Sequence, residues 1–310
     1  MAFALGKNNN RGIVGLDLDG QFLAAVQASP DGVTRAVSTE LQPGVISEGE
    51  VTDVPALSEA LKEFFKENNL PRRVRLGVSN QQIVVRHMEL PRIEDPKELD
   101  AAVRFQASEA IAMPLDEVVL DHQVIGETIT PDGAARLRIV VVAARESMIS
   151  RVVDAVRGAG LRPEGIDLNT FALVRTLSLP SDSAESSRVY VHLGGVTNLA
   201  IALGSICLFT RPLSTQWDVE DESIAGALAE EIRLSVDFYM AQPEARWVGE
   251  VVLSGPGARR NGLADELGGM IDVPVTVAEP LGRLGENEVP TGEDPYRHTI
   301  ATGLALGASA

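Results

Sequence analysis

The 310-residue sequence contains very little cysteine and few basic residues, and each shortage excludes a class of protein. The single cysteine, Cys207, cannot form an intrachain disulfide or a thiolate metal cluster, so we expect a reducing compartment such as the cytoplasm. Only 27 basic residues stand against 44 acidic ones, and the net charge of -17 repels nucleic-acid phosphates and anionic lipids alike. We therefore expect no nucleic acid and no lipid surface among the partners.

Long apolar runs are missing as well. The longest run, at residues 139–144, is far shorter than the ~20 residues that cross a bilayer. Residues 1–11 have a short apolar start followed by glycine, lysine and three asparagines, so we expect a tail and no secretory signal there. Any association with a membrane should depend on a partner, without direct insertion of this chain.

Motifs for catalysis or metal binding are also scarce. The four histidines, His87, His122, His192 and His298, have no metal-ligand spacing, so we expect no zinc site. The sequence contains neither a G-x-S-x-G nucleophile motif nor a P-loop lysine. Asp121 follows an apolar segment, where a carboxylate more often caps a strand end or forms an ion pair than acts as a catalytic acid.

What the sequence does contain is one strand pattern that occurs twice. Residues 12–27 are typical of a strand, a glycine turn and a second strand, and a third strand follows the turn at 29–32. Residues 189–204 repeat this unit, and another strand begins at residue 206. Because 45% of the residues are hydrophobic and the chain is long, we predict two α/β lobes.

An α+β insertion is predicted inside the first lobe, at about residues 81–165. Asp95, Pro96 and Glu98 provide a cap, a first-turn proline and an acidic third position for a helix, and Pro114 stops it. The polar stretch 180–188 indicates a linker. The predicted domains are a tail at 1–11, a first lobe at 12–179 that contains the insertion, a linker at 180–188 and a second lobe at 189–310.

Three glycine turns are candidates for ligand binding, at residues 17–21, 194–198 and 254–258. A turn without Cβ atoms brings several backbone N–H groups onto one point, which suits a phosphate. Each turn alone is usually an ordinary tight turn. Their order, one in each half and one near the end, resembles the two phosphate loops and the adenosine loop of the actin, Hsp70 and sugar-kinase superfamily.

A longer resemblance spans nearly the whole chain. Its most specific part is residues 84–126, VVRHMELPRIEDPKELDAAVRFQASEAIAMPLDEVVLDHQVIG, and it continues through residues 159–175, 209–214 and 231–239. These segments are similar to the PilM family of type IV pilus assembly proteins. The resemblance implies an α/β fold of the two-lobed, actin-like ATPase type, with ribonuclease H-like halves and an SHS2-type insertion as in FtsA.

The resemblance also implies partners, a location and a ligand. A PilM-like protein is expected to be a cytoplasmic scaffold at the inner face of the membrane, bound to the N-terminal tail of a PilN-like membrane protein. Through that protein it would connect indirectly to PilO and to the pilus motor. ATP and Mg²⁺ are the implied ligands. Their implied contacts are Asp17, Asp19, Gly20, Gln21, Gly194, Gly195, Val196, Thr197, Asn198, Glu231, Gly255, Pro256 and Gly257.

Asp17 would face Mg²⁺ through water, and it is the residue expected to act if the site is catalytic. The other key positions depart from the family pattern. Asp19 adds a carboxylate beside the phosphates, Ala24 replaces a lysine, and His192 stands where an aspartate is usual. Leu234 stands where relatives carry arginine, and few residues separate Ser214 from Glu231, so we predict a truncated helical subdomain.

These departures favour a degenerate nucleotide site and a protein that is no enzyme, or at most a weak ATPase. The alternative is an ATP-dependent conformational switch of the same machinery. An FtsA-like division protein or a superfamily kinase is a lower alternative, since a kinase needs a general base near the cleft and only Asp17 offers one.

Overall fold

The computed structural model describes residues 12–29, 32–130, 133–178, 185–217, 224–243, 245–278 and 294–307. The predicted tail at 1–11 and most of the predicted linker lie outside these residues. The chain divides into two compact units, a larger one of Ala4–Asn80 with Val153–Ala310 and a smaller one containing Gln81–Val152. In the described parts, no helix combines the length and the apolar character needed to cross a membrane.

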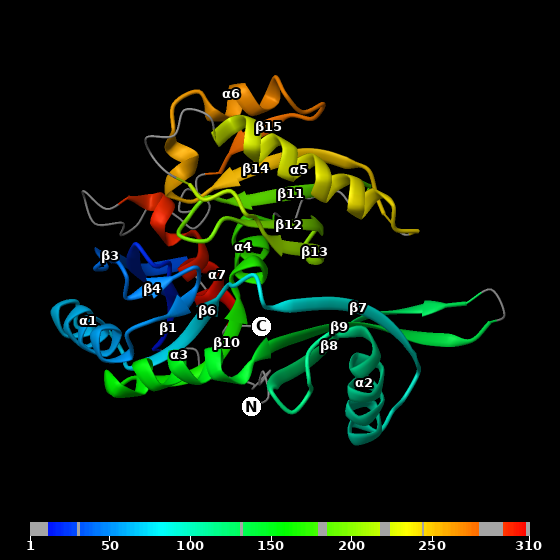
Figure 1. Cartoon of the computed structure of the whole chain (residues 1–310), viewed down its shortest axis with the longest axis horizontal. Coiled ribbons are helices and arrows are strands. Elements are labelled where there is room, and N and C mark those ends of the chain that lie inside the picture. Colours follow the sequence, from blue (N-terminus) through cyan, green and yellow to red (C-terminus); the bar gives the residue numbers. More distant parts are fainter. Residues whose placement is uncertain are drawn as a thin grey trace. The chain divides into compact units, whose positions relative to one another are not determined.

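The first sheet of the larger unit has the strand order β10-β6-β1-β2-β3 (Figure 1). Strands β1, β2 and β3 form an antiparallel meander, whereas β6 and β10 run parallel to β1. The bounds are β1 Ile13–Leu18, β2 Phe22–Ser29, β3 Gly32–Glu40, β6 Arg73–Val78 and β10 Arg162–Leu168. A short hairpin of β4 Ile46–Ser47 and β5 Glu50–Val51 follows the meander.

The second sheet repeats this topology, with the order β13-β12-β11-β14-β15. Its first three strands again form an antiparallel meander, and β14 and β15 again lie parallel to β11. The bounds are β11 Ser187–His192, β12 Asn198–Leu203, β13 Ile206–Pro212, β14 Val248–Ser254 and β15 Val275–Val277. The repeated strand unit predicted from the sequence is therefore confirmed, and the α/β fold with it.

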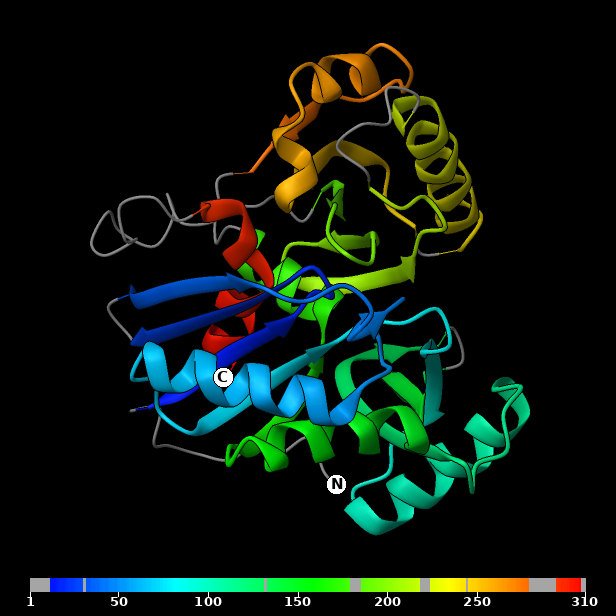
Figure 2. The ribbon, with the colours of Figure 1, turned by 60° about the vertical axis from the view of Figure 1, so that its left-hand side comes forward.

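Helices cover the outer faces of both sheets. On the first sheet, α1 (Val54–Glu67) lies beside the end of α3 (Glu146–Gly158), where Ser58 donates a hydrogen bond to the carbonyl of Ala155 (Figure 2). Asp53 begins α1 because its carboxylate accepts from the N–H of Ala56. On the second sheet, the apolar faces of α5 (Ile224–Met240) and α6 (Leu263–Gly268) complete the core.

Two helices lie between the sheets and contact both of them. Helix α4 (Asn169–Leu177) and helix α7 (Thr299–Gly307) pack on each other, on strand β12 and on strands β1 and β2. A Cβ at Gly15 would lie 2.0 Å from the carbonyl oxygen of Ala301, so α7 rests directly on β1. The predicted division at residues 180–188 places α4 in the first lobe and α7 in the second. The structure instead shares both helices between the sheets.

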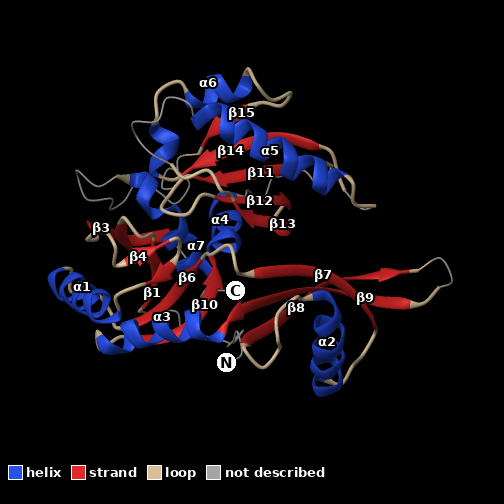
Figure 3. Ribbon diagram, in the orientation of Figure 1, coloured by secondary structure: helices blue, strands red, loops and turns tan. Residues whose placement is uncertain are grey.

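The smaller unit is one antiparallel sheet covered by one helix, which Figure 3 shows by secondary structure. Its strands, in the order β7-β9-β8, are β7 Val84–Pro91, β8 Val118–Ile129 and β9 Ala135–Arg145. Helix α2 (Pro96–Ala110) packs Val103 and Ala107 on this sheet, and Asp95 caps it by accepting from two backbone N–H groups.

The insertion ends earlier than the predicted residue 165. The compact unit stops at Val152, inside α3, and β10 belongs to the first sheet. The reason is that β10 pairs in parallel with β6 from Arg162 to Leu168, which satisfies its backbone groups there. As the sequence predicts, few residues separate the end of β13 at Pro212 from the start of α5 at Ile224.

Candidate functional site

The two predicted phosphate turns meet in the larger unit. The N–H of Gly195, in the turn between β11 and β12, donates to Oδ2 of Asp19, in the turn between β1 and β2, over 2.7 Å. A Cβ at Gly195 would lie 2.0 Å from the backbone oxygen of Asp19, and one at Gly194 would lie 2.4 Å from its carboxylate. Glycine is therefore required at both positions for this contact.

Asp19 is buried at the meeting point of these turns. It is 8% exposed, and its other oxygen lies 3.4 Å from the N–H of Gln21. Burial raises the pKa of Asp19 to about 6, while the N–H groups of Gly195 and Gln21 and the charge of Arg297 oppose that rise. At neutral pH the side chain is therefore mainly a carboxylate, and it acts as a hydrogen-bond acceptor. Gly20 completes the turn with a φ of 103°.

Asp17 lies in β1 opposite Ala24 of β2 and has a different environment. It is 1% exposed, and among the described residues neither carboxylate oxygen has a hydrogen-bond partner. Burial, and then the charge of Asp19, raise the pKa of Asp17 well above its usual value. The raised pKa favours the protonated form of Asp17, which is a poorer ligand for Mg²⁺ than a carboxylate.

His192 ends strand β11 beside the second turn. Its Nδ1 lies 3.1 Å from Oγ of Ser254, while its Nε2 is buried next to Gly194 and has no partner in the part of the chain that the structure describes. Burial lowers the pKa of His192 to about 4, so the ring is neutral. A neutral imidazole in this place supplies no negative charge to hold a cation.

The remaining residues of the second turn serve mostly to fix its shape. Asn198 donates from Nδ2 to the carbonyl of Val196 over 2.8 Å and accepts from Oγ of Ser79. The hydroxyl of Thr197 is buried and has no hydrogen-bond partner within the described ranges, although the Thr197 carbonyl accepts from the N–H of Leu213. The turn is therefore tied both to the loop after β6 and to the end of β13.

The third glycine turn packs on the second one. Gly255 has a φ of 84°, and the N–H of Gly257 donates to the carbonyl of Leu193 over 3.0 Å. The indole of Trp217 covers Gly257, where a Cβ would lie 2.5 Å from the ring atom Cδ1. Pro256 begins the short helix η1 (Pro256–Arg259). The first turn thus contacts the second, and the third turn packs on the second.

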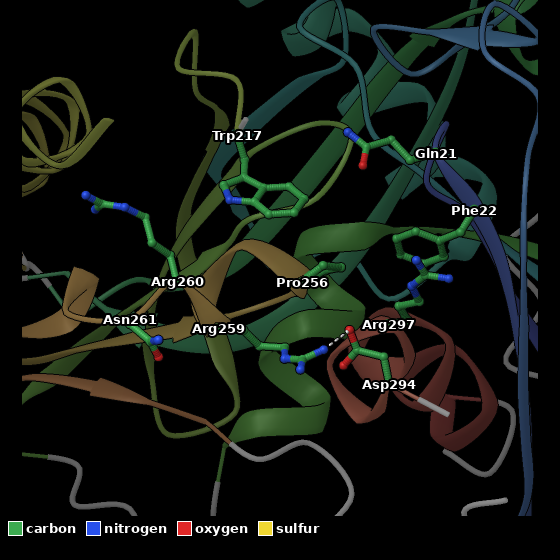
Figure 4. Close-up of a pocket in the computed structure, with 9 residues that line it drawn as sticks. All are labelled: Gln21, Phe22, Trp217, Pro256, Arg259, Arg260, Asn261, Asp294 and Arg297. Carbon is green, nitrogen blue, oxygen red and sulfur yellow. Dashed lines mark hydrogen bonds and ion pairs between the residues drawn. The ribbon is translucent and has the colours of Figure 1, made fainter. Parts of the chain in front are cut away.

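A pocket of about 670 Å³ opens beside these turns (Figure 4). Of the residues predicted to bind nucleotide, Gln21 and Pro256 line it. The other lining residues are Phe22, Trp217, Arg259, Arg260, Asn261, Asp294 and Arg297.

The arginines of the pocket are held by acidic partners. Arg259 pairs with Asp294 at 2.9 Å, and the guanidinium of Arg297 lies 5.1 Å from the centre of the Phe22 ring and pairs with Glu40. Trp217, Arg259 and Arg297 are not among the residues that the sequence predicts to bind nucleotide, because no local motif marks them. Arg297 comes from the short helix η2 (Pro295–His298), far along the chain from Phe22.

Glu231 does not line the pocket. Its carboxylate accepts from the N–H groups of Ser214 and Thr215 at 3.0 Å and lies 3.4 Å from a guanidinium nitrogen of Arg211. These contacts fix the start of the connection between β13 and α5. Leu234, on the same helix, is 53% exposed.

The backbone donor of the second turn already has a partner within the protein. The N–H of Gly195, which a phosphate oxygen would need, already binds Asp19. A phosphate placed there would also face the ionised carboxylate of Asp19. In the described part of the chain, no three His, Cys, Asp or Glu side chains are grouped to hold a metal ion.

Two sheets of the same topology, with shared helices between them and glycine turns that meet, define the class of actin-like ATPase folds. Three solved structures support this assignment. A PilM-PilN type IV pilus biogenesis complex matches with a TM-score of 0.83 and 24% identity, over 97% of this chain and 100% of that chain. The ethanolamine utilization protein EutJ from Carboxydothermus hydrogenoformans matches with 0.54 and 14%, over 94% and 88%. MreB5 of Spiroplasma citri bound to ADP matches with 0.52 and 8%, over 96% and 96%.

Residues 23–215 match the family model for the type IV pilus assembly protein PilM. The chain therefore belongs to the PilM family, and the resemblance found in the sequence is confirmed.

Proposed function

We propose that this protein is a cytoplasmic scaffold of the type IV pilus assembly platform and that it binds the N-terminal tail of a PilN-like membrane protein. The observation that carries the proposal is the match of residues 23–215 to the PilM family. The similar solved structure is a PilM-PilN complex, which supports the same kind of partner here. Through that partner the protein would lie at the inner face of the membrane and connect to a PilO-like protein and the motor.

An extended tail can bind such a protein by adding a strand to an exposed sheet edge. In the described sheet of the smaller unit, β7 and β8 each pair only with β9, so each has an edge without a strand neighbour. The chain's charge of -17 favours a tail that carries lysine or arginine.

We further propose that the nucleotide site is degenerate and that hydrolysis is slow or absent. The raised pKa of Asp17, the lowered pKa of His192 and the contact between Asp19 and Gly195 support this proposal. The actin-like class also contains nucleotide-bound members such as MreB5 with ADP, which keeps an ATP-dependent switch as the second candidate.

The test of the scaffold role is the binding of a fluorescent peptide with the sequence of the PilN-like tail, followed by anisotropy. We expect a dissociation constant of tens of micromolar or tighter, which corresponds to ~6 to 7 kcal/mol. A scrambled peptide of the same charge is the control. The scaffold proposal is wrong if both peptides bind equally or if neither binds.

A further inference from the structure

The backbone nest of the second turn contains an anion that belongs to the protein itself. Oδ2 of Asp19 lies 2.7 Å from the N–H of Gly195, and the carboxylate also fills the space beside Gly194. A carboxylate and a phosphate oxygen seek the same backbone donors. The position that would receive the outer phosphates of a nucleotide is therefore taken by a side chain.

The first turn is shaped to present this carboxylate. The N–H of Asp19 donates to the carbonyl of Phe22 over 3.2 Å, and Gly20 adopts a φ of 103° that only glycine adopts readily. Asp19 is 8% exposed and mainly ionised at neutral pH, so an added polyphosphate would bring further negative charge to this carboxylate. Repulsion therefore increases with each phosphate that a ligand carries.

The neighbouring pocket remains open, and its walls suit a base. Its volume of about 670 Å³ falls in the usual range of small-molecule sites. Trp217 presents an aromatic ring, and Gln21 and Asn261 present amide groups that can bind the polar edge of a base (Figure 4). Phe22 is 1% exposed and lies beneath the guanidinium of Arg297, so it supports this wall from behind. Arg259 lines the same space and pairs with Asp294 at 2.9 Å, so a single phosphate there would share its guanidinium with that carboxylate.

We propose that this pocket binds a nucleoside or a nucleoside monophosphate, and that Asp19 is the specificity-determining residue that excludes di- and triphosphates. The proposal deepens the degenerate nucleotide site proposed above and rests on it. It is independent of the scaffold role.

The test is isothermal titration calorimetry of the full chain with adenosine, AMP, ADP and Mg-ATP. The wild-type protein should bind adenosine and AMP, and its affinity should fall at least about tenfold from AMP to ATP. Asp19→Ser removes the carboxylate and frees the N–H of Gly195, so this variant should reverse the order and bind ATP best. Asp116→Ser, at an exposed aspartate of the smaller unit, is the matched control and should keep the wild-type order.

Asp19→Asn provides a second variant in case the serine variant folds poorly. Its amide oxygen can still accept from Gly195, so it should reject ATP less strongly than the wild type but more strongly than the serine variant. The proposal is overturned if the wild type binds ATP as well as AMP or binds none of the four ligands. It is also overturned if both Asp19 variants fold and keep the wild-type order. Binding of the PilN-like tail, measured on the same samples, separates these outcomes from a failure of the scaffold proposal.

Discussion

Replacing Asp19 with asparagine should stabilise the larger unit at neutral pH. Burial raises the pKa of this carboxyl group from 3.8 to about 6, so the native state binds the proton more tightly than the unfolded chain does. Stability therefore falls as the pH rises between these two values, because ionisation then favours unfolding. The difference between the two pKa values corresponds to a loss of about 3 kcal/mol in the free energy of unfolding once the pH exceeds both values.

The net gain should be smaller than this figure. The asparagine amide is a weaker acceptor for the N–H of Gly195 than a carboxylate, which offsets part of the gain. We expect the variant to be about 1 to 2 kcal/mol more stable at pH 7.5 and equal to the wild type at low pH, where Asp19 is neutral in both states.

Urea unfolding followed by tryptophan fluorescence measures this difference. Trp217 and Trp247 are the two tryptophans of the sequence and both lie in the larger unit, so the signal reports that unit alone. Asp116→Asn is the control, because this side chain is exposed and lies in the smaller unit. The reasoning is refuted if Asp19→Asn is less stable at neutral pH or if its effect does not change with pH.

Two further predictions test the same site. Gly195→Ala should cost about 1 to 3 kcal/mol in thermal unfolding, because the new Cβ would lie 2.0 Å from the Asp19 carbonyl oxygen; Gly226→Ala, where a Cβ meets open space, should be neutral or slightly stabilising, and equal effects of the two would contradict the contact. ATP turnover with Mg²⁺ should stay at background with or without the PilN-like tail, since burial favours the protonated form of Asp17 and the neutral ring of His192. Rapid turnover that the tail stimulates and Asp17→Ala abolishes would favour the ATP-dependent switch.

The sequence predicts the parts of this fold that short segments determine. Strand alternation and glycine turns reveal the two meanders, and the cap at Asp95 locates helix α2. The end of the insertion is less predictable, because β10 joins the first sheet through its register with β6, a contact between residues far apart in sequence. The shared positions of α4 and α7 depend on the same kind of distant packing.

The candidate site, too, is only partly predictable from the sequence. Gly194, Gly195 and Asp19 are recognisable in the sequence because turns have local signatures, and the charge of Asp19 predicts repulsion of a phosphate. The hydrogen bond from Gly195 to Asp19 is not recognisable, since it joins residues 176 apart. Trp217 and Arg297 enter the pocket for similar reasons of packing.

The position of α7 has a consequence for how the protein folds during synthesis. Ala301 and Ala305 of this helix cover Phe22 and Ala24, so the apolar face of the first strands stays uncovered until α7 has been synthesised. At ~5 to 20 residues per second, the interval between the synthesis of β2 and that of α7 is on the order of 15 to 60 seconds. During this time the face is open to other chains and to chaperones. A ribosome that stalls before residue 299 therefore leaves a nascent chain whose first sheet lacks part of its core.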